Sequence, residues 1–139
     1  METTVILLKP DCVGRRLVGE VIRRFEAAGF TIKGAKMMAM TRELLREHYA
    51  HLVAEPFYPL LEAFMMSSPV IALAVGGDGV IERARTLVGP TDSRKAAAGT
   101  IRGDLGTDNR RNILHASDSP EAAAKELSRF FHSGELFGD

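Results

Sequence analysis

The chain lacks most features that mark secreted, membrane or nucleic-acid-binding proteins. Its 139 residues include one cysteine, Cys12, so no disulfide can form within the chain. No window approaches the roughly 18 apolar residues of a membrane span, and the apolar stretch at 5–8 is too short for a signal peptide. Lysine plus arginine (18) balances aspartate plus glutamate (18), whereas nucleic-acid binders are usually basic. We therefore expect a cytoplasmic protein with no membrane partner and no need of nucleic acid.

Common phosphate-binding and metal-binding motifs are also missing. The sequence contains no G-x-x-x-x-G-K-[ST] loop, and the glycines within 76–79 do not form a dinucleotide-binding fingerprint. His48, His51 and His132 are not spaced from cysteines or acidic residues as in a metal site. Any polyphosphate would have to be held by side chains, and we expect no metal ion bound directly by the protein.

The apolar pattern predicts one domain spanning 1–139, and the composition is ordinary for a globular protein, with 45% hydrophobic and 26% charged residues. Helices are predicted over 13–28, 42–53, 58–66, 81–88 and 120–131, the last with Ser119 as N-cap. Strands are predicted over 3–8, 30–41, 69–75 and 112–114, the third buried on both faces. A long loop is expected over 89–111. With the helices gathered on one face, this order favours an α+β, ferredoxin-like α/β sandwich with a four-stranded antiparallel sheet (βαββαβ).

The segment NILHASDS, residues 112–119, places His115 where the last predicted strand ends. One nitrogen of a neutral imidazole is a nucleophile, and the other carries a proton that an acceptor must hold. At 100° per residue, Glu126 falls on the flank of the buried stripe of the following helix, from which its carboxylate can reach inward. Periodicity alone leaves open the alternative of a turn histidine and a solvated glutamate.

Several cationic and hydroxyl side chains are suited to binding an anion. Lys9 follows a buried strand, so its ammonium should emerge at the edge of the sheet. Arg85, Thr91 and Arg102 offer guanidinium forks and a hydroxyl for phosphate oxygens. The alternatives are a lysine that only aids solubility and a mobile, charged surface loop.

Two aromatic residues lie near a proline break. Phe57 directly follows Pro56, and Tyr49 lies in the segment before it. An exposed ring there can stack on a nucleobase, because every base has a flat π-face. The alternative is that both rings belong to the core.

Taken together, these segments resemble the nucleoside diphosphate kinase family. The resemblance rests on VILLKPDCVG (5–14), Glu47-His48-Tyr49, Pro56-Phe57, GTIRGD (99–104) and NILHASDS (112–119), and it extends over about 3–137. It implies transfer of the γ-phosphate of a nucleoside triphosphate, typically ATP, to a nucleoside diphosphate. The implied route is ping-pong, through a phosphohistidine on His115. The ferredoxin-like fold agrees with that family.

The resemblance also implies a role for each matching residue. The catalytic group would be His115, Glu126, Lys9 and Tyr49. The nucleotide would contact Lys9, Phe57, Leu61, Arg85, Thr91, Arg102, Asn109 and Asn112, with Phe57 on the base and Asn112 on the sugar. Mg²⁺ would arrive with the nucleotide, held by phosphates and water. The family further implies a homo-oligomer, a hexamer in preference to a tetramer.

Six positions depart from the family pattern. Cys12 and Ala116 stand where the family usually has glycine, and Ser93 and Ala98 stand where it often has proline. His51 replaces an acidic residue, and Glu55 replaces a basic residue or a glycine. None removes a reacting group, although Glu55 is expected to weaken anion binding and the missing prolines to affect assembly. Two rival functions remain: a phosphohistidine donor to another protein, and a non-enzymatic, ferredoxin-like module that binds nucleic acid.

Overall fold

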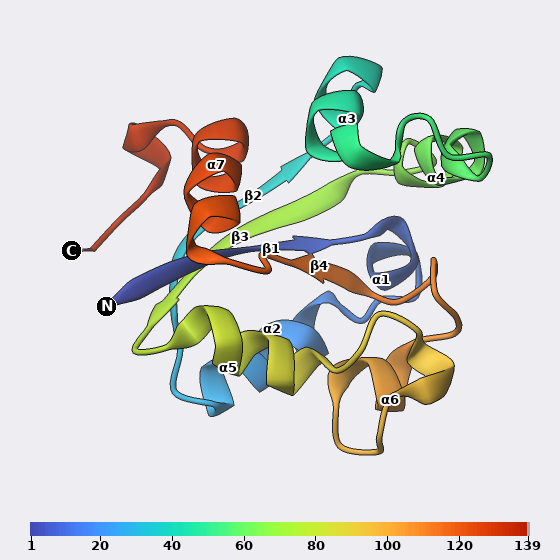
Figure 1. Ribbon diagram of the computed structural model, residues 1–139. Coiled ribbons are helices and arrows are strands. Elements are labelled where there is room, and N and C mark those ends of the chain that lie inside the picture. Colours follow the sequence, from blue (N-terminus) through green and yellow to red (C-terminus); the bar gives the residue numbers. More distant parts are fainter. Residues whose placement is uncertain (139) are drawn as a thin grey trace.

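The computed structural model describes residues 1–138, which form a four-stranded antiparallel sheet flanked by helices (Figure 1). The strands are β1 (Glu2–Leu8), β2 (Thr31–Met38), β3 (Val70–Gly77) and β4 (Leu114–Ala116), in the order β2-β3-β1-β4. The helices are α1 (Pro10–Gly14), α2 (Val18–Ala27), α3 (Arg42–His48), α4 (Tyr58–Met65), α5 (Val80–Val88), α6 (Ile101–Leu105) and α7 (Pro120–Phe130). Short 3₁₀ turns lie at η1 (Ala50–Leu52), η2 (Ser93–Lys95) and η3 (Ser133–Glu135). The predicted ferredoxin-like class is confirmed.

Helices cover both faces of the sheet, so the expectation that they gather on one face is wrong. Figure 1 places α2 and α5 on one side and α3, α4 and α7 on the other. In β1, Ile6 and Leu8 pack into the core on the α2 and α5 side, whereas Val5 and Leu7 pack into the core that contains Phe130 of α7. Successive strand residues point to opposite faces, so a continuously apolar strand needs a layer on each side.

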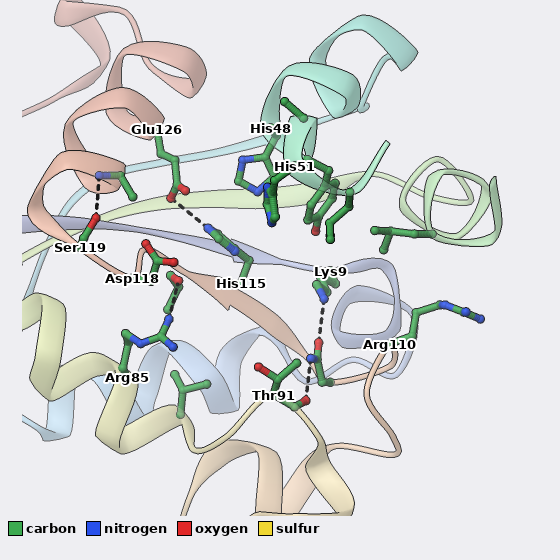
Figure 2. Close-up of a pocket in the computed structure, with 18 of the residues that line it drawn as sticks. Lys9, His48, His51, Arg85, Thr91, Arg110, His115, Asp118, Ser119 and Glu126 are labelled. Carbon is green, nitrogen blue, oxygen red and sulfur yellow. Dashed lines mark hydrogen bonds and ion pairs between the residues drawn. The ribbon is translucent and has the colours of Figure 1, made fainter. Parts of the chain in front are cut away.

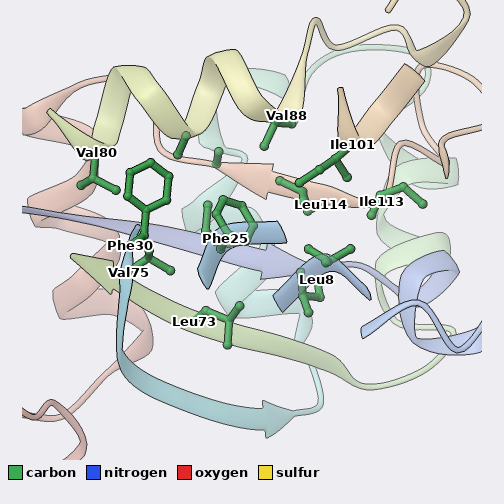
Figure 3. Packing of buried hydrophobic residues seen from close by; sticks show 14 of the residues in the cluster. Leu8, Phe25, Phe30, Leu73, Val75, Val80, Val88, Ile101, Ile113 and Leu114 are labelled. Atoms are coloured by element: carbon green, nitrogen blue, oxygen red, sulfur yellow. The ribbon is translucent and has the colours of Figure 1, made fainter. Parts of the chain in front are cut away.

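The core on the α2 and α5 side is seen in Figure 3. Leu8, Leu73 and Val75 project from the sheet toward Phe25 of α2 and Val80 of α5. Burial of a side chain such as Phe25 contributes about 1.5–3 kcal/mol to stability. This layer fixes α5, and therefore Arg85, relative to the strands.

Several predicted boundaries change. The helix predicted over 13–28 is two helices, α1 and α2, because the backbone turns left-handed at Arg16 (φ 59°). The supposed loop 89–111 contains η2 and α6. β2 ends at Met38 and α3 at His48, both earlier than predicted. The Ser119 N-cap is confirmed, since its Oγ accepts a hydrogen bond of 3.0 Å from the Ala122 N–H. No helix within residues 1–138 is long and apolar enough to cross a membrane.

Candidate active site

A cleft of about 910 Å³ opens beside β4, and every candidate catalytic or nucleotide-binding residue predicted from the sequence lines it. Figure 2 shows side chains from several elements meeting there. The predicted residues that line it are Lys9, Tyr49, Phe57, Leu61, Arg85, Thr91, Arg102, Asn109, Asn112, His115 and Glu126. They come from segments far apart in the sequence, so the sheet order and the helices on both faces together assemble this site.

His115 faces an ionised carboxylate. Its Nε2 lies 2.9 Å from Oε1 of Glu126, and the Ser117 hydroxyl donates to the same oxygen at 2.6 Å. Burial opposes ionisation of Glu126, but the hydrogen bond and the charge from His115 and the hydrogen bond from Ser117 outweigh it and lower the pKa of Glu126. A carboxylate only accepts, so in the neutral form of the ring Nε2 carries the proton and Nδ1 keeps its lone pair. Glu126 is 7% exposed, which excludes a solvated role.

The backbone before His115 is held in an uncommon conformation. Ile113 has φ 78°, which is an outlier for a β-branched residue. Its N–H donates to Oδ2 of Asp11 at 3.0 Å, and its carbonyl accepts from the N–H of Lys9 at 2.9 Å. β4 therefore starts at Leu114, later than the predicted 112–114, so His115 lies within the strand, opposite Leu7, and not at its end as predicted. Strain of this kind persists where neighbouring contacts fix the chain.

Lys9 reaches the cleft from a buried position. Its Nζ donates to Oδ1 of Asn112 at 2.7 Å, and the amide of Asn112 donates in turn to the carbonyl of Thr91 at 2.9 Å. Burial, followed by the nearby charge of Arg102, lowers the pKa of Lys9 to about 8. Lys9 is therefore an ammonium at neutral pH that gives up its proton more readily than a surface lysine, which argues against a purely solubilising role.

Arg102 is attached to the main chain around the cleft. It donates to the carbonyls of Asn112 (3.0 Å), Gly89 (3.1 Å) and Leu114 (2.6 Å). Burial, followed by the charge of Arg85, lowers the pKa of Arg102 to about 10, so the guanidinium stays charged at neutral pH. Three of its five N–H donors are thus committed to backbone, and two remain for an anion. The loop around it is ordered by these bonds and is not a loose charged segment.

The two aromatic candidates differ in exposure. Tyr49 is buried in the core and also lines the cleft, and burial raises the pKa of Tyr49 so that its hydroxyl stays protonated. Phe57, just before α4, is 42% exposed and leaves a ring face available. Only Phe57 offers the open ring that stacking on a base requires.

Sequence reasoning missed His48. Its buried ring packs edge-on against His115, with centroids 4.6 Å apart, and its Nδ1 accepts from Nη1 of Arg129 at 3.1 Å. Burial, followed by the neighbouring His115, lowers the pKa of His48 to about 3, so the ring is neutral. Ligand atoms of His48, His115 and Glu126 lie within 4.8 Å of one another, a grouping that the sequence spacing did not suggest. Hydrogen bonds already occupy Nε2 of His115 and Nδ1 of His48, and the Arg129 cation beside His48 disfavours a metal ion at this grouping.

The departures from the family pattern leave the reacting groups in place. Cys12 is buried, and burial followed by the charge of Asp11 raises the pKa of its thiol to about 12. His51 is exposed and lines the cleft. Glu55 is exposed and is not among the lining residues, so its carboxylate does not form part of the wall of the cleft.

The family model described as Nucleoside diphosphate kinase matches residues 2–136. The chain belongs to this family. An enzyme of this family transfers phosphate between nucleotides, so the non-enzymatic nucleic-acid-binding alternative is set aside.

Individual relatives agree with this assignment. The nucleoside diphosphate kinase of Rubrobacter xylanophilus is 51% identical over 131 residues, covering 94% of this chain and 98% of its own length. That of Rhodopirellula baltica is 48% identical over 136 residues, covering 98% and 90%. The Aquifex aeolicus enzyme structure has a TM-score of 0.93 at 41% identity, covering 98% of this chain and 99% of that one. The halophilic Halobacterium salinarum enzyme in complex with CDP has a TM-score of 0.96 at 39% identity, covering 99% and 92%.

Proposed function

We propose that the γ-phosphate of a nucleoside triphosphate, typically ATP, passes to a nucleoside diphosphate through a phosphohistidine on His115. The supporting observation is the 2.9 Å contact between Nε2 of His115 and Glu126, which leaves Nδ1 free in the cleft. The Nδ1 lone pair attacks the γ-phosphorus, and the bond to the β–γ bridging oxygen breaks and releases a diphosphate. A terminal oxygen of the second diphosphate then attacks the phosphorus and breaks the P–N bond. Covalent capture divides one transfer into two easier steps.

Charge in the cleft would stabilise the moving phosphoryl group. We assign Lys9 and the Tyr49 hydroxyl to that group, and Arg85, Thr91 and the two spare donors of Arg102 to the remaining phosphates. Phosphoryl transfer needs little covalent work from the protein, so positioning and charge neutralisation supply most of the catalysis. In the same scheme Asn112 meets the sugar, Phe57 stacks on the base, and Leu61 and Asn109 flank it.

A divalent cation is implied by the family, and we propose Mg²⁺. This cation prefers oxygen ligands and keeps several waters, and it would be held by the nucleotide phosphates and water. The cleft fits such a complex: Asp118 lines it, is exposed, and has no side-chain hydrogen bond or ion pair within residues 1–138. Its carboxylate can accept from a water on the cation, whose charge would be neutralised mainly by phosphate.

We also propose that residues 1–139 act as one domain, in the cytoplasm, within a homo-oligomer. The family favours a hexamer over a tetramer. Sedimentation gives the particle mass directly, and a monomer at working concentration would contradict the assembly. Ser93 and Ala98 stand where the family often has prolines that stiffen this loop, so we expect the oligomer to be less stable than in relatives that carry them.

The exchange itself is tested by labelling. Brief incubation with γ-labelled ATP is expected to give an acid-labile phosphoenzyme, and added GDP or CDP should then remove the label. A label that no diphosphate removes would contradict nucleotide exchange and would favour a phosphohistidine donor that acts on a protein.

Phe57→Ala is expected to raise KM for every nucleoside diphosphate by a similar factor. Stacking on an aromatic ring is worth about 1–3 kcal/mol per base and tolerates all bases. Steady-state kinetics with ADP, GDP, CDP and UDP measure the effect. A loss confined to one base would mean that Phe57 does not act as a general stacking platform.

Activity is expected to depend on pH through Lys9, whose pKa lies at about 8. Below this value the ammonium is present, and above it the charge is lost, so kcat/KM should fall as pH rises past about 8. A bound phosphate favours the ammonium, so kcat should fall only at higher pH. Lys9→Gln should lower kcat/KM and remove this alkaline limb; a limb that persists unchanged in the variant would assign it to another group.

A further inference from the structure

Arg110 is a cation in the cleft without an assigned partner. Figure 2 places it at the opposite end from Glu126, and it is half-buried among the lining residues. Its guanidinium has no hydrogen bond or ion pair in the described part of the chain, whereas Arg85, Arg102 and Arg129 are all bonded to neighbouring groups. Arg110 therefore has all of its donors available for a ligand.

The backbone of Arg110 is fixed even though its side chain is unpaired. One carboxylate oxygen of Asp108 accepts from the N–H of Arg110 at 2.9 Å and from the N–H of Arg111 at 2.7 Å. The N–H of Thr107 donates to the carbonyl of Arg111 at 2.8 Å, which closes the turn. An aspartate that bonds to N–H groups two and three residues ahead stabilises a turn. The side chain thus starts from a rigid position in the wall of the cleft.

The end of the cleft away from Glu126 is where a base would lie. The phosphates belong near His115. The apolar lining residues Phe57 and Leu61 lie at and within α4, which Figure 1 places away from α7, the helix that carries Glu126. Stacking on Phe57 does not discriminate between bases, so any preference must come from a contact with a base edge. Arg110 is suited to one kind of edge, since a guanidinium only donates hydrogen bonds.

We propose that Arg110 is a specificity-determining residue that favours bases with a keto edge over bases with an amino edge. Guanine presents O6 and N7, two acceptors that match the guanidinium fork, and uracil and thymine present O4. Adenine and cytosine present an amino donor at the corresponding position, which finds no acceptor on arginine. The inference rests on the nucleotide cleft of the proposed function and adds a base preference to it.

The test compares kcat/KM for GDP, ADP, UDP and CDP with one triphosphate donor, in the unaltered enzyme and in Arg110→Met. Methionine keeps an unbranched stem and removes all donors. The GDP-to-ADP ratio is expected to exceed one in the unaltered enzyme and to fall by about tenfold in the variant. The UDP-to-CDP ratio should fall less, because O4 accepts a single bond. Because the side chain of Arg110 has no partner in residues 1–138, and the backbone bond to Asp108 is kept in the variant, folding should be unaffected, which a thermal melt verifies.

Arg111→Met is the matched control. It removes the same charge one residue away, from an exposed side chain that does not line the cleft. All four kcat/KM values should then move together and leave the ratios unchanged. Equal losses for all four diphosphates in Arg110→Met, or ratios that fall equally in both variants, would overturn the role of Arg110. Failure of the unaltered enzyme to phosphorylate any diphosphate would overturn the proposed function as well.

Discussion

His115→Ala is expected to abolish both phosphoenzyme formation and nucleotide exchange. The variant lacks the only group in the scheme that bonds to phosphorus, and Glu126 would be left holding the Ser117 hydroxyl alone. Removal of the nucleophile from a coupled catalytic group costs many orders of magnitude in rate, because the remaining members cannot act without it. The measurement is label retained on the protein after brief exposure to γ-labelled ATP, together with the rate of GTP formation from GDP.

The control for this experiment is His132→Ala. His132 is exposed and is not among the residues that line the cleft, so its variant should still become labelled. Thermal melts separate a chemical effect from unfolding, since His115 is only partly buried and its loss should leave the sheet intact. Label that persists on folded His115→Ala would place the phosphate on another residue and refute the proposed route.

Some residues of the cleft could be located from the sequence because they fall next to element ends, whereas Leu61, Asn109 and Asn112 followed only from the resemblance to the family. His115 follows an apolar strand and Glu126 flanks a helical stripe, and the fold brings the two within hydrogen-bond distance. The contact between His48 and His115 was not predicted, because it joins segments far apart in the sequence and periodicity carries no information on which segments meet. The motif Glu47-His48-Tyr49 was the available signal.

The fold was predicted in its order of elements but not in its details. Alternating and continuous apolar patterns predicted four strands in the observed order. The helices on the second face could have been predicted from β1 and β3, because both strands are apolar and buried on both faces. The left-handed residue at the break, Arg16, is neither glycine nor proline. Helix α6 is only five residues long, below the length at which periodicity is informative. The shift of β4 depends on Asp11 holding a left-handed Ile113, a tertiary contact that overrides local preference.

Arg102→Met is expected to lower both the stability and the nucleotide affinity of the enzyme. Three carbonyls, those of Gly89, Asn112 and Leu114, would lose a charged donor, and hydrogen bonds to charged groups contribute about 1.5–3 kcal/mol each. The free energy of unfolding should therefore fall by about 3 kcal/mol or more, after some replacement by water. Urea denaturation measures this loss, and KM should rise for all nucleotides because the two spare donors are lost as well.

Arg102→Lys separates the two contributions of Arg102. Lysine keeps the positive charge but lacks the planar fork, so it cannot reach three divergent carbonyls at once. It should therefore keep part of the nucleotide affinity while it loses most of the stability that Arg102→Met loses. Arg94→Met, which removes an exposed arginine paired with Asp92, controls for net charge and should unfold at nearly the same urea concentration as the unaltered enzyme. If Arg102→Lys instead matches the unaltered enzyme in urea, the three carbonyl contacts do not hold the loop, and Arg102 acts on the phosphates through its charge alone.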